Sequence, residues 1–176
     1  PITEVIKEDL AHRTACARLQ TPLGGLVVIG TIIPYSGRDC PPYGQLRRWD
    51  AHYAAIAVQG AAWQRLRRQY TDCALCVAGD FNQTREGRLS YGTKWGRHLL
   101  DQALAWANLK DATTPTFAAL NRVDSDGWLL ADGVQPIDHI CLSSEWAKRV
   151  TAVGAWSGKP DDGYLSDHSG VWVDLK

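Results

Sequence analysis

Apolar and polar positions repeat with two different periods along the chain, and each change of period marks the start of an expected element. Residues 14–21 and 26–34 are short runs rich in strand-forming residues, separated by Pro22 and a glycine pair. This arrangement predicts an antiparallel hairpin. From residue 46 to 70 the apolar residues return at helical spacing, beginning with Trp49 and Tyr53, so a helix is expected there.

The rest of the chain continues this alternation of strands and helices. A second helix is expected over residues 94–108, and strands are expected over 74–82, 127–130, 136–143, 147–153 and 171–175. Strands outnumber helices, and many of them are sequential. The pattern therefore predicts an α/β sandwich of mostly antiparallel sheets, flanked by helices on the outer faces and built as a single domain over residues 1–176.

Composition narrows the class of protein. The chain of 176 residues has 19 basic and 19 acidic residues, so no overall positive charge attracts nucleic acid and any such binding must use a local patch. No apolar run is long enough to span a membrane, and the first ten residues do not resemble a signal peptide. Five cysteines, an odd number, favour a reducing, cytoplasmic location, with Cys73 and Cys76 expected to pack in the core rather than to bind zinc.

The stretch VAGDFNQ, residues 77–83, ends an apolar run abruptly in polar residues. On an extended strand end, Asp80 and Asn82 share one face, and Phe81 anchors the opposite face. Such an ending suits a platform for polar chemistry. It is equally consistent with an ordinary turn, because Asp, Asn and Gly are common turn residues.

Two further acid-containing clusters lie at strand ends, Asp138 with His139 and Asp167 with His168. Asp138 lies among apolar residues, and a buried carboxylate needs a partner, which His168 could supply. Together with the carboxylate of Asp167, these groups are the parts for metal-assisted hydrolysis of a phosphodiester. Taken singly, each cluster is more often a turn than a catalytic site.

The order of the clusters is more specific than any one of them. GDFN, then IDHI, then SDHSGV leading into the final VWVDL strand resembles the endonuclease/exonuclease/phosphatase superfamily, which has the fold of deoxyribonuclease I. The resemblance covers nearly all of the chain, from residue 26 to the end. It implies a four-layer sandwich of two central sheets between helical layers, a phosphoester substrate such as nucleic acid, and Mg²⁺ or Mn²⁺ as cofactor.

The resemblance also implies a role for each matching residue. Asp80 would orient or deprotonate the attacking water, or protonate the leaving oxygen, and Asn82 would hold a non-bridging oxygen of the phosphate. Asp167 would ligate Mg²⁺ or Mn²⁺. His168 would hydrogen-bond the phosphoryl group, and Asp138 would orient His168. His139 has no firm role in the pattern.

Two departures from the family pattern stand out. Many members carry an Asn followed by a His or Tyr on the strand that matches residues 26–34, and here only Thr31 offers a hydroxyl to the phosphate. Members also begin with strands that bear an Asn and then a metal-binding Glu, and nothing before Leu26 matches these. We therefore expect that the chain lacks the N-terminal part of the fold.

Three functions are compatible with these residues. The first is a divalent-metal-dependent phosphoester hydrolase, nuclease or phosphatase, that is inactive in this chain alone. The second is a non-catalytic binding module or truncated remnant of such an enzyme, and the third is a structural domain whose polar clusters are turns. Because missing strands would leave an open sheet edge and an uncovered apolar face, we also expect the chain to form a homo-oligomer. The sequence does not distinguish DNA, RNA, phospholipid or phosphosugar as the substrate.

Overall fold

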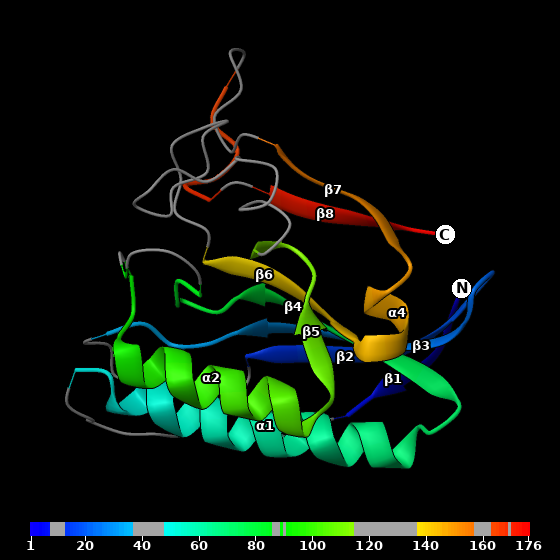
Figure 1. The fold of residues 1–176 in the computed structure, drawn as a ribbon, viewed down its shortest axis with the longest axis horizontal. Helices are drawn as coiled ribbons and strands as arrows, with labels where there is room; N and C mark the ends of the chain where they lie inside the picture. Colours follow the sequence, from blue (N-terminus) through cyan, green and yellow to red (C-terminus); the bar gives the residue numbers. More distant parts are fainter. Residues whose placement is uncertain are drawn as a thin grey trace.

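A computed structural model describes residues 1–7, 13–36, 48–85, 89, 91–114, 137–156, 163–168 and 170–176. The described elements form three layers (Figure 1). Helices α1 (Asp50–Gln69) and α2 (Lys94–Trp106) pack side by side beneath a six-stranded sheet, and a two-stranded sheet lies on the opposite side of that sheet. The predicted α/β sandwich is confirmed.

The six-stranded sheet has the order β1-β2-β3-β4-β6-β5. Only β3 and β4 are parallel, and every other neighbouring pair in the two sheets is antiparallel, as the sequence predicted. The crossover from β3 to β4 runs through α1, which is the connection that a parallel pair requires. The strands are β1 (Ile2–Ile6), β2 (Thr14–Thr21), β3 (Gly24–Ile32), β4 (Cys73–Asp80), β5 (Leu109–Asp111), β6 (Asp138–Ser143), β7 (Val150–Trp156) and β8 (Gly170–Leu175).

The main core lies between the helices and the sheet. β4 is buried along most of its length, and its alternate residues Leu75 and Val77 face α1, which contributes Ile56 and Trp63. The helices approach closely because Gly60 has no side chain where a Cβ would collide with that of Ala103. The helical layer therefore covers one face of β4, and the side chain of Asp80 lies on the opposite face.

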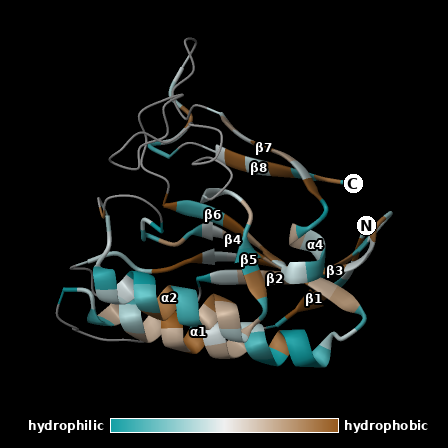
Figure 2. Ribbon diagram, viewed as in Figure 1, coloured by the Kyte–Doolittle hydropathy of each residue, from teal (hydrophilic) through white to brown (hydrophobic). Residues whose placement is uncertain are grey.

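A second apolar cluster lies on the other face of the large sheet. Cys76 and Leu142 of the sheet pack there with Trp146 and with Val173 and Leu175 of β8. Figure 2 shows hydrophobic segments within β1, β6 and β8, and hydrophilic positions on the visible side of α2 and at the C-terminal end of α1. Strands β7 and β8 therefore cover the β4–β6 part of this face, next to the polar strand ends discussed below.

The elements differ from the sequence prediction in three places, one of which is the short strand β5, which was not predicted. β1 was not predicted, because ITEVI alternates weakly and becomes a strand only by pairing antiparallel with β2. The strand expected over 147–153 is preceded by a short helix, α4 (Ser144–Ala147), and begins at Val150. The strand predicted over 127–130 lies outside the described residues. No described helix is both long enough and apolar enough to cross a membrane.

Candidate active site

The end of β4 has an unusual backbone conformation, with positive φ angles at Gly79 and Asn82. Gly79 has a φ of 139°, and a Cβ at this position would collide with the carbonyl oxygen of Thr31 on the neighbouring strand. Asn82 has a φ of 48°, the left-handed conformation that asparagine tolerates better than most residues. The glycine and the asparagine therefore turn the chain sharply at the point where the polar residues begin.

This turn brings Asp80 and Asn82 into direct contact. The backbone N–H of Asn82 donates to Oδ1 of Asp80 over 2.7 Å, and its side-chain amide donates to Oδ2 over 2.8 Å. The same amide also donates to the carbonyl oxygen of Ile33 over 2.9 Å. Phe81 is fully buried on the other side, where its ring stacks near Trp63. The segment is thus an anchored turn whose two polar side chains are held together.

A second carboxylate lies directly opposite Asp80. In the antiparallel β4–β6 ladder Asp80 pairs with Asp138, so both side chains are on the same face of the sheet. Oδ2 of Asp138 lies 2.6 Å from Nδ1 of His168, which comes from the segment leading into β8. One ligand atom from each of Asp80, Asp138 and His168 lies within 4.8 Å of the other two. Three segments far apart in sequence therefore meet at one point.

The surroundings shift the pKa values of this cluster. Burial raises the pKa of Asp80 to about 6, and the nearby charge of Asp138 adds to this, against the opposing hydrogen bond from the N–H of Asn82. Burial acts to lower the pKa of His168, but the hydrogen bond and the charge of Asp138 outweigh it and raise that pKa above its ordinary value. An acid that titrates near neutral pH beside a cationic imidazole is suited to proton transfer.

The donor set of the cluster fits a divalent cation. Asp80 and Asp138 offer carboxylate oxygens and His168 offers an imidazole nitrogen, a combination that suits Mn²⁺ and, through the carboxylates, Mg²⁺. Asp167, the residue predicted to ligate the metal, is exposed and contributes a negative charge near His168. It is not one of the three described residues whose donor atoms come within 4.8 Å of one another.

The other two residues considered in the sequence lie on the helical side of the sheet. Thr31 is 4% exposed, and its hydroxyl donates to Oε1 of Gln59 on α1 over 2.6 Å. It shares a face with Ile29 of the main core, whereas Asp80 is on the opposite face. His139 is completely buried and lies next to Phe81, so it does not line the rim of the site.

Two charged residues close to the site were missed in the sequence. Arg85, in a segment read as a polar loop, and Asp111, at the end of the short strand β5, form an ion pair at 2.9 Å behind the Asp80 turn. Neither residue lies in a periodic pattern or a motif, so only the fold brings them together.

Comparison with solved structures identifies the fold. The chain superposes on a variant of the 3′ phosphatase NExo from Neisseria bound to a product DNA hairpin, with a TM-score of 0.65 and 17% identity, covering 93% of this chain and 65% of the other. It superposes similarly on the 3′-5′ exonuclease NExo from Neisseria meningitidis, with a TM-score of 0.64, 16% identity and coverage of 93% and 64%. An AP endonuclease from Archaeoglobus fulgidus gives a TM-score of 0.62, 14% identity and coverage of 99% and 70%.

The chain has the fold of the endonuclease/exonuclease/phosphatase superfamily. The match to this fold extends over nearly the whole chain, which confirms the fold that the resemblance implied. The chain spans about two thirds of the length of these solved structures, 64–70%. No protein-family model and no curated protein sequence matches the chain.

Proposed function

We propose that the chain carries the phosphate-binding half of a divalent-metal-dependent phosphoester hydrolase, acting on nucleic acid. The observation that carries this proposal is the convergence of Asp80, Asp138 and His168 from three separate segments, with Asn82 bonded to Asp80. The fold supports it, because the similar structures are a 3′ phosphatase bound to a product DNA hairpin, a 3′-5′ exonuclease and an AP endonuclease. A structural domain whose acids serve only as turns would not need an acid pair facing one histidine.

Each residue has a role that follows from its surroundings. Asp80, with a pKa of about 6, accepts a proton from the attacking water or returns one to the leaving oxygen. His168 donates from Nδ1 to Asp138, and its raised pKa favours the cationic ring, whose Nε2–H can donate to a phosphoryl oxygen. The side-chain amide of Asn82 already donates to Asp80 and Ile33, and it must release one of these bonds to donate to a phosphate oxygen.

A divalent cation belongs to the proposal, with Asp80, Asp138 and His168 as the donor set and Asp167 as an additional carboxylate at the rim. When bound, Mg²⁺ or Mn²⁺ would supply positive charge next to the phosphoryl oxygens. Asp138 cannot serve the cation and orient His168 with the same oxygen, because its Oδ2 is already 2.6 Å from Nδ1.

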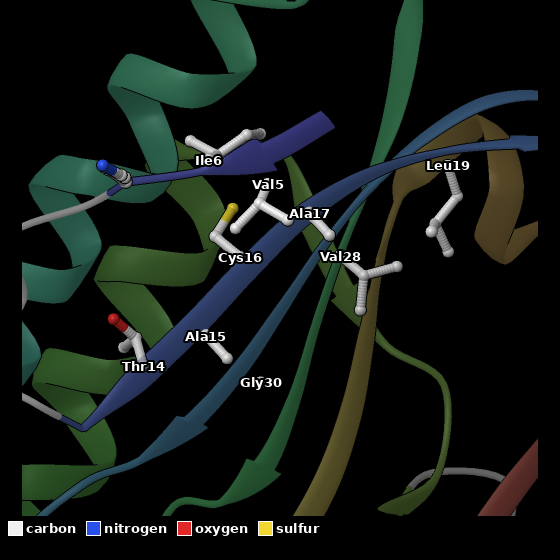
Figure 3. A pocket seen from close by; sticks show the side chains of 10 residues that line it. Val5, Ile6, Thr14, Ala15, Cys16, Ala17, Leu19, Val28 and Gly30 are labelled. Atoms are coloured by element: carbon white, nitrogen blue, oxygen red, sulfur yellow. The ribbon is translucent and has the colours of Figure 1, made fainter. Parts of the chain in front are cut away.

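The open face of the large sheet suggests that the active form contains more strands than this chain. Beyond the cover of β7 and β8, the apolar side chains of Val5, Ala17, Leu19 and Val28 border a hollow of about 660 Å³ on β1–β3 (Figure 3). Val5 is 72% exposed, although it lies on a strand beside apolar partners. We propose that this chain alone has negligible hydrolase activity and self-associates through this face, and that a covering segment completes the enzyme.

The function is tested by comparing two proteins. The first is the chain from Pro1, and the second is a longer chain that adds the coding sequence upstream of Pro1. Both are incubated with a DNA oligonucleotide that carries a 3′ phosphate or an abasic site, with Mn²⁺, with Mg²⁺ or with chelator. We expect metal-dependent release of phosphate or strand cleavage from the longer chain and little from the shorter one.

The alternative function is a non-catalytic binding module. It is favoured by the incomplete cover of the β1–β3 face and by the length of the chain relative to the solved structures. In that case both proteins would bind the oligonucleotide without turnover, with or without metal. Metal-dependent turnover that His168→Ala abolishes would exclude the binding module.

A further inference from the structure

A buried network of charged and polar groups lies behind the Asp80 turn, on the helical side of the sheet. At its centre is His139, which follows Asp138 in β6 and therefore points to the opposite face. While Asp138 faces His168, His139 is completely buried and faces the segment that follows β4. Asp138 thus contacts the proposed active site on one face of the sheet, and His139 contacts the segment after β4 on the other face.

Both nitrogens of His139 are engaged. Nε2 lies 2.8 Å from the backbone carbonyl oxygen of Gln83, and because a carbonyl only accepts, Nε2 carries a hydrogen and donates. Nδ1 lies 2.8 Å from Oγ1 of Thr114 and 3.2 Å from Oδ2 of Asp111. The imidazole therefore connects the carbonyl next to Asn82 with a carboxylate from another strand.

Asp111 is held on every side. Its Oδ2 accepts from Nη1 of Arg85 over 2.9 Å, and its Oδ1 accepts from the backbone N–H groups of Thr113 and Thr114. Burial alone would raise the pKa of Asp111, but His139 and Arg85 outweigh burial and hold that pKa well below its usual range. The carboxylate is therefore ionised and 3% exposed, a costly arrangement unless its partners stay in place.

Arg85 connects the network to the segment that follows β4, the same segment that His139 contacts at Gln83. It lies three residues beyond Asn82, and its guanidinium contacts buried Asp111 and, over 2.5 Å, the more exposed Asp101 of α2. The turn that begins at Asp80 is thus fixed twice, at the carbonyl of Gln83 by His139 and at the side chain of Arg85 by Asp111. Between these two points Thr84 is also fully buried.

We propose that Arg85, Asp111 and His139 are positioning residues, which hold the Gln83–Arg85 segment so that Asp80 and Asn82 stay aligned with the Asp138–His168 pair. They do not contact the phosphate, because they lie on the opposite face of the sheet. The effect of these residues on turnover rests on the proposed hydrolase function. The positioning itself is a property of the chain and can be measured without activity.

Two substitutions of His139 separate positioning from mere stability. His139→Phe keeps a ring against Phe81, whose centroid is 5.2 Å from that of His139, but removes the donor to the Gln83 carbonyl. His139→Gln retains an N–H group that can reach this carbonyl and an oxygen that can accept from Thr114. Glu145→Gln, which removes an arginine–carboxylate pair with Arg67 outside this network, is the control.

The measurements are kcat and KM on the oligonucleotide substrate, and amide hydrogen exchange of residues 81–85, at a temperature where each variant is folded. For His139→Phe we expect kcat to fall by about 10- to 100-fold with KM nearly unchanged, and local exchange to become faster by a similar factor. His139→Gln should restore most of both values, and Glu145→Gln should change neither.

The proposal would be overturned if folded His139→Phe had the kcat and the amide exchange of wild type. It would also be overturned if kcat fell and exchange rose in His139→Phe, and His139→Gln recovered neither. If His139→Phe does not fold, hydrogen exchange of residues 81–85 in His139→Gln decides the question. Exchange close to the wild-type rate supports the proposal, and much faster exchange contradicts it. If the wild-type longer chain has no turnover, the hydrolase function fails, and hydrogen exchange alone still tests whether the network holds the 81–85 segment.

Discussion

Asp80 and Asp138 face each other as direct partners across the β4–β6 ladder, two carboxylates on one face of a sheet. Like charges in this arrangement repel, and burial already disfavours the ionised form of Asp80. The pair is therefore stable as a neutral acid beside an ionised one, or with a cation or His168 between them. This relationship sets the protonation chemistry of the site.

Asp80 should make the folded chain less stable as the pH rises. Its folded pKa, about 6, is above its ordinary value of 3.8, so the folded state binds more protons between these pH values. Asp80 therefore increasingly destabilises the fold as pH rises through this window. In Asp80→Asn this destabilisation is absent. We expect the stability of the variant relative to wild type to increase by about 2 kcal/mol between pH 4 and pH 7, measured by urea unfolding with chelator present. A pH-independent difference would contradict the shift.

The ionisation of His168 should depend on Asp138. Because the hydrogen bond and charge of Asp138 overcome the effect of burial, Asp138→Asn should lower the pKa of His168. Stability from the raised pKa is fully present below the unfolded-state value and is lost as pH rises through the folded-state value. NMR titration of the His168 ring in wild type and variant measures the change. An unchanged His168 titration would show that the pair does not form in solution.

His168 should be essential for turnover. His168→Ala removes the group that faces the phosphoryl oxygen, and in the active longer chain we expect kcat to fall by at least about 100-fold. The substitution is at a partly exposed side chain, so the melting temperature should change little. His98→Ala, an exposed histidine of α2, is the matched control. Full activity of His168→Ala would remove His168 from the site.

Gly79 should tolerate no side chain. Its φ of 139° and the carbonyl oxygen of Thr31 leave no room for a Cβ, so Gly79→Ala should lower the free energy of unfolding by about 2–4 kcal/mol. Gly163→Ala, where a Cβ meets no atom within 4 Å, should cost far less. Thermal unfolding of the two variants tests the comparison, and equal losses would mean that the sharp turn at Gly79 does not form.

Self-association should depend on the open β1–β3 face. Ala17→Glu introduces a charge into the apolar hollow, and we expect it to shift the chain from dimer toward monomer in light scattering. Ala105→Glu, on the exposed side of α2, is the matched alanine control. A monomeric wild-type chain would refute the homo-oligomer, and a dimer unaffected by Ala17→Glu would place the contact elsewhere.

The sequence alone was sufficient for helices α1 and α2, for most of the strands and for the positions of the polar clusters. Helix α1 follows from its apolar spacing, and the β2–β3 hairpin follows from two strand-forming runs around a turn. The Gly79–Asn82 ending was recognisable because glycine, an acid and an amide follow a strand that is otherwise apolar. These features are local, so the residues that cause them are close together in the chain.

What only the tertiary structure decided is which side chains meet. The pairing of Asp80 with Asp138 depends on the register of β4 against β6, and a shift of one residue would turn Asp138 to the other face. Strand β1 exists because β2 offers it a ladder, not because of its own pattern. The contact of Arg85 with Asp111 and of His139 with Gln83 joins residues 26 and 56 positions apart. Such contacts depend on the packing of whole layers, and no local pattern of residues encodes them.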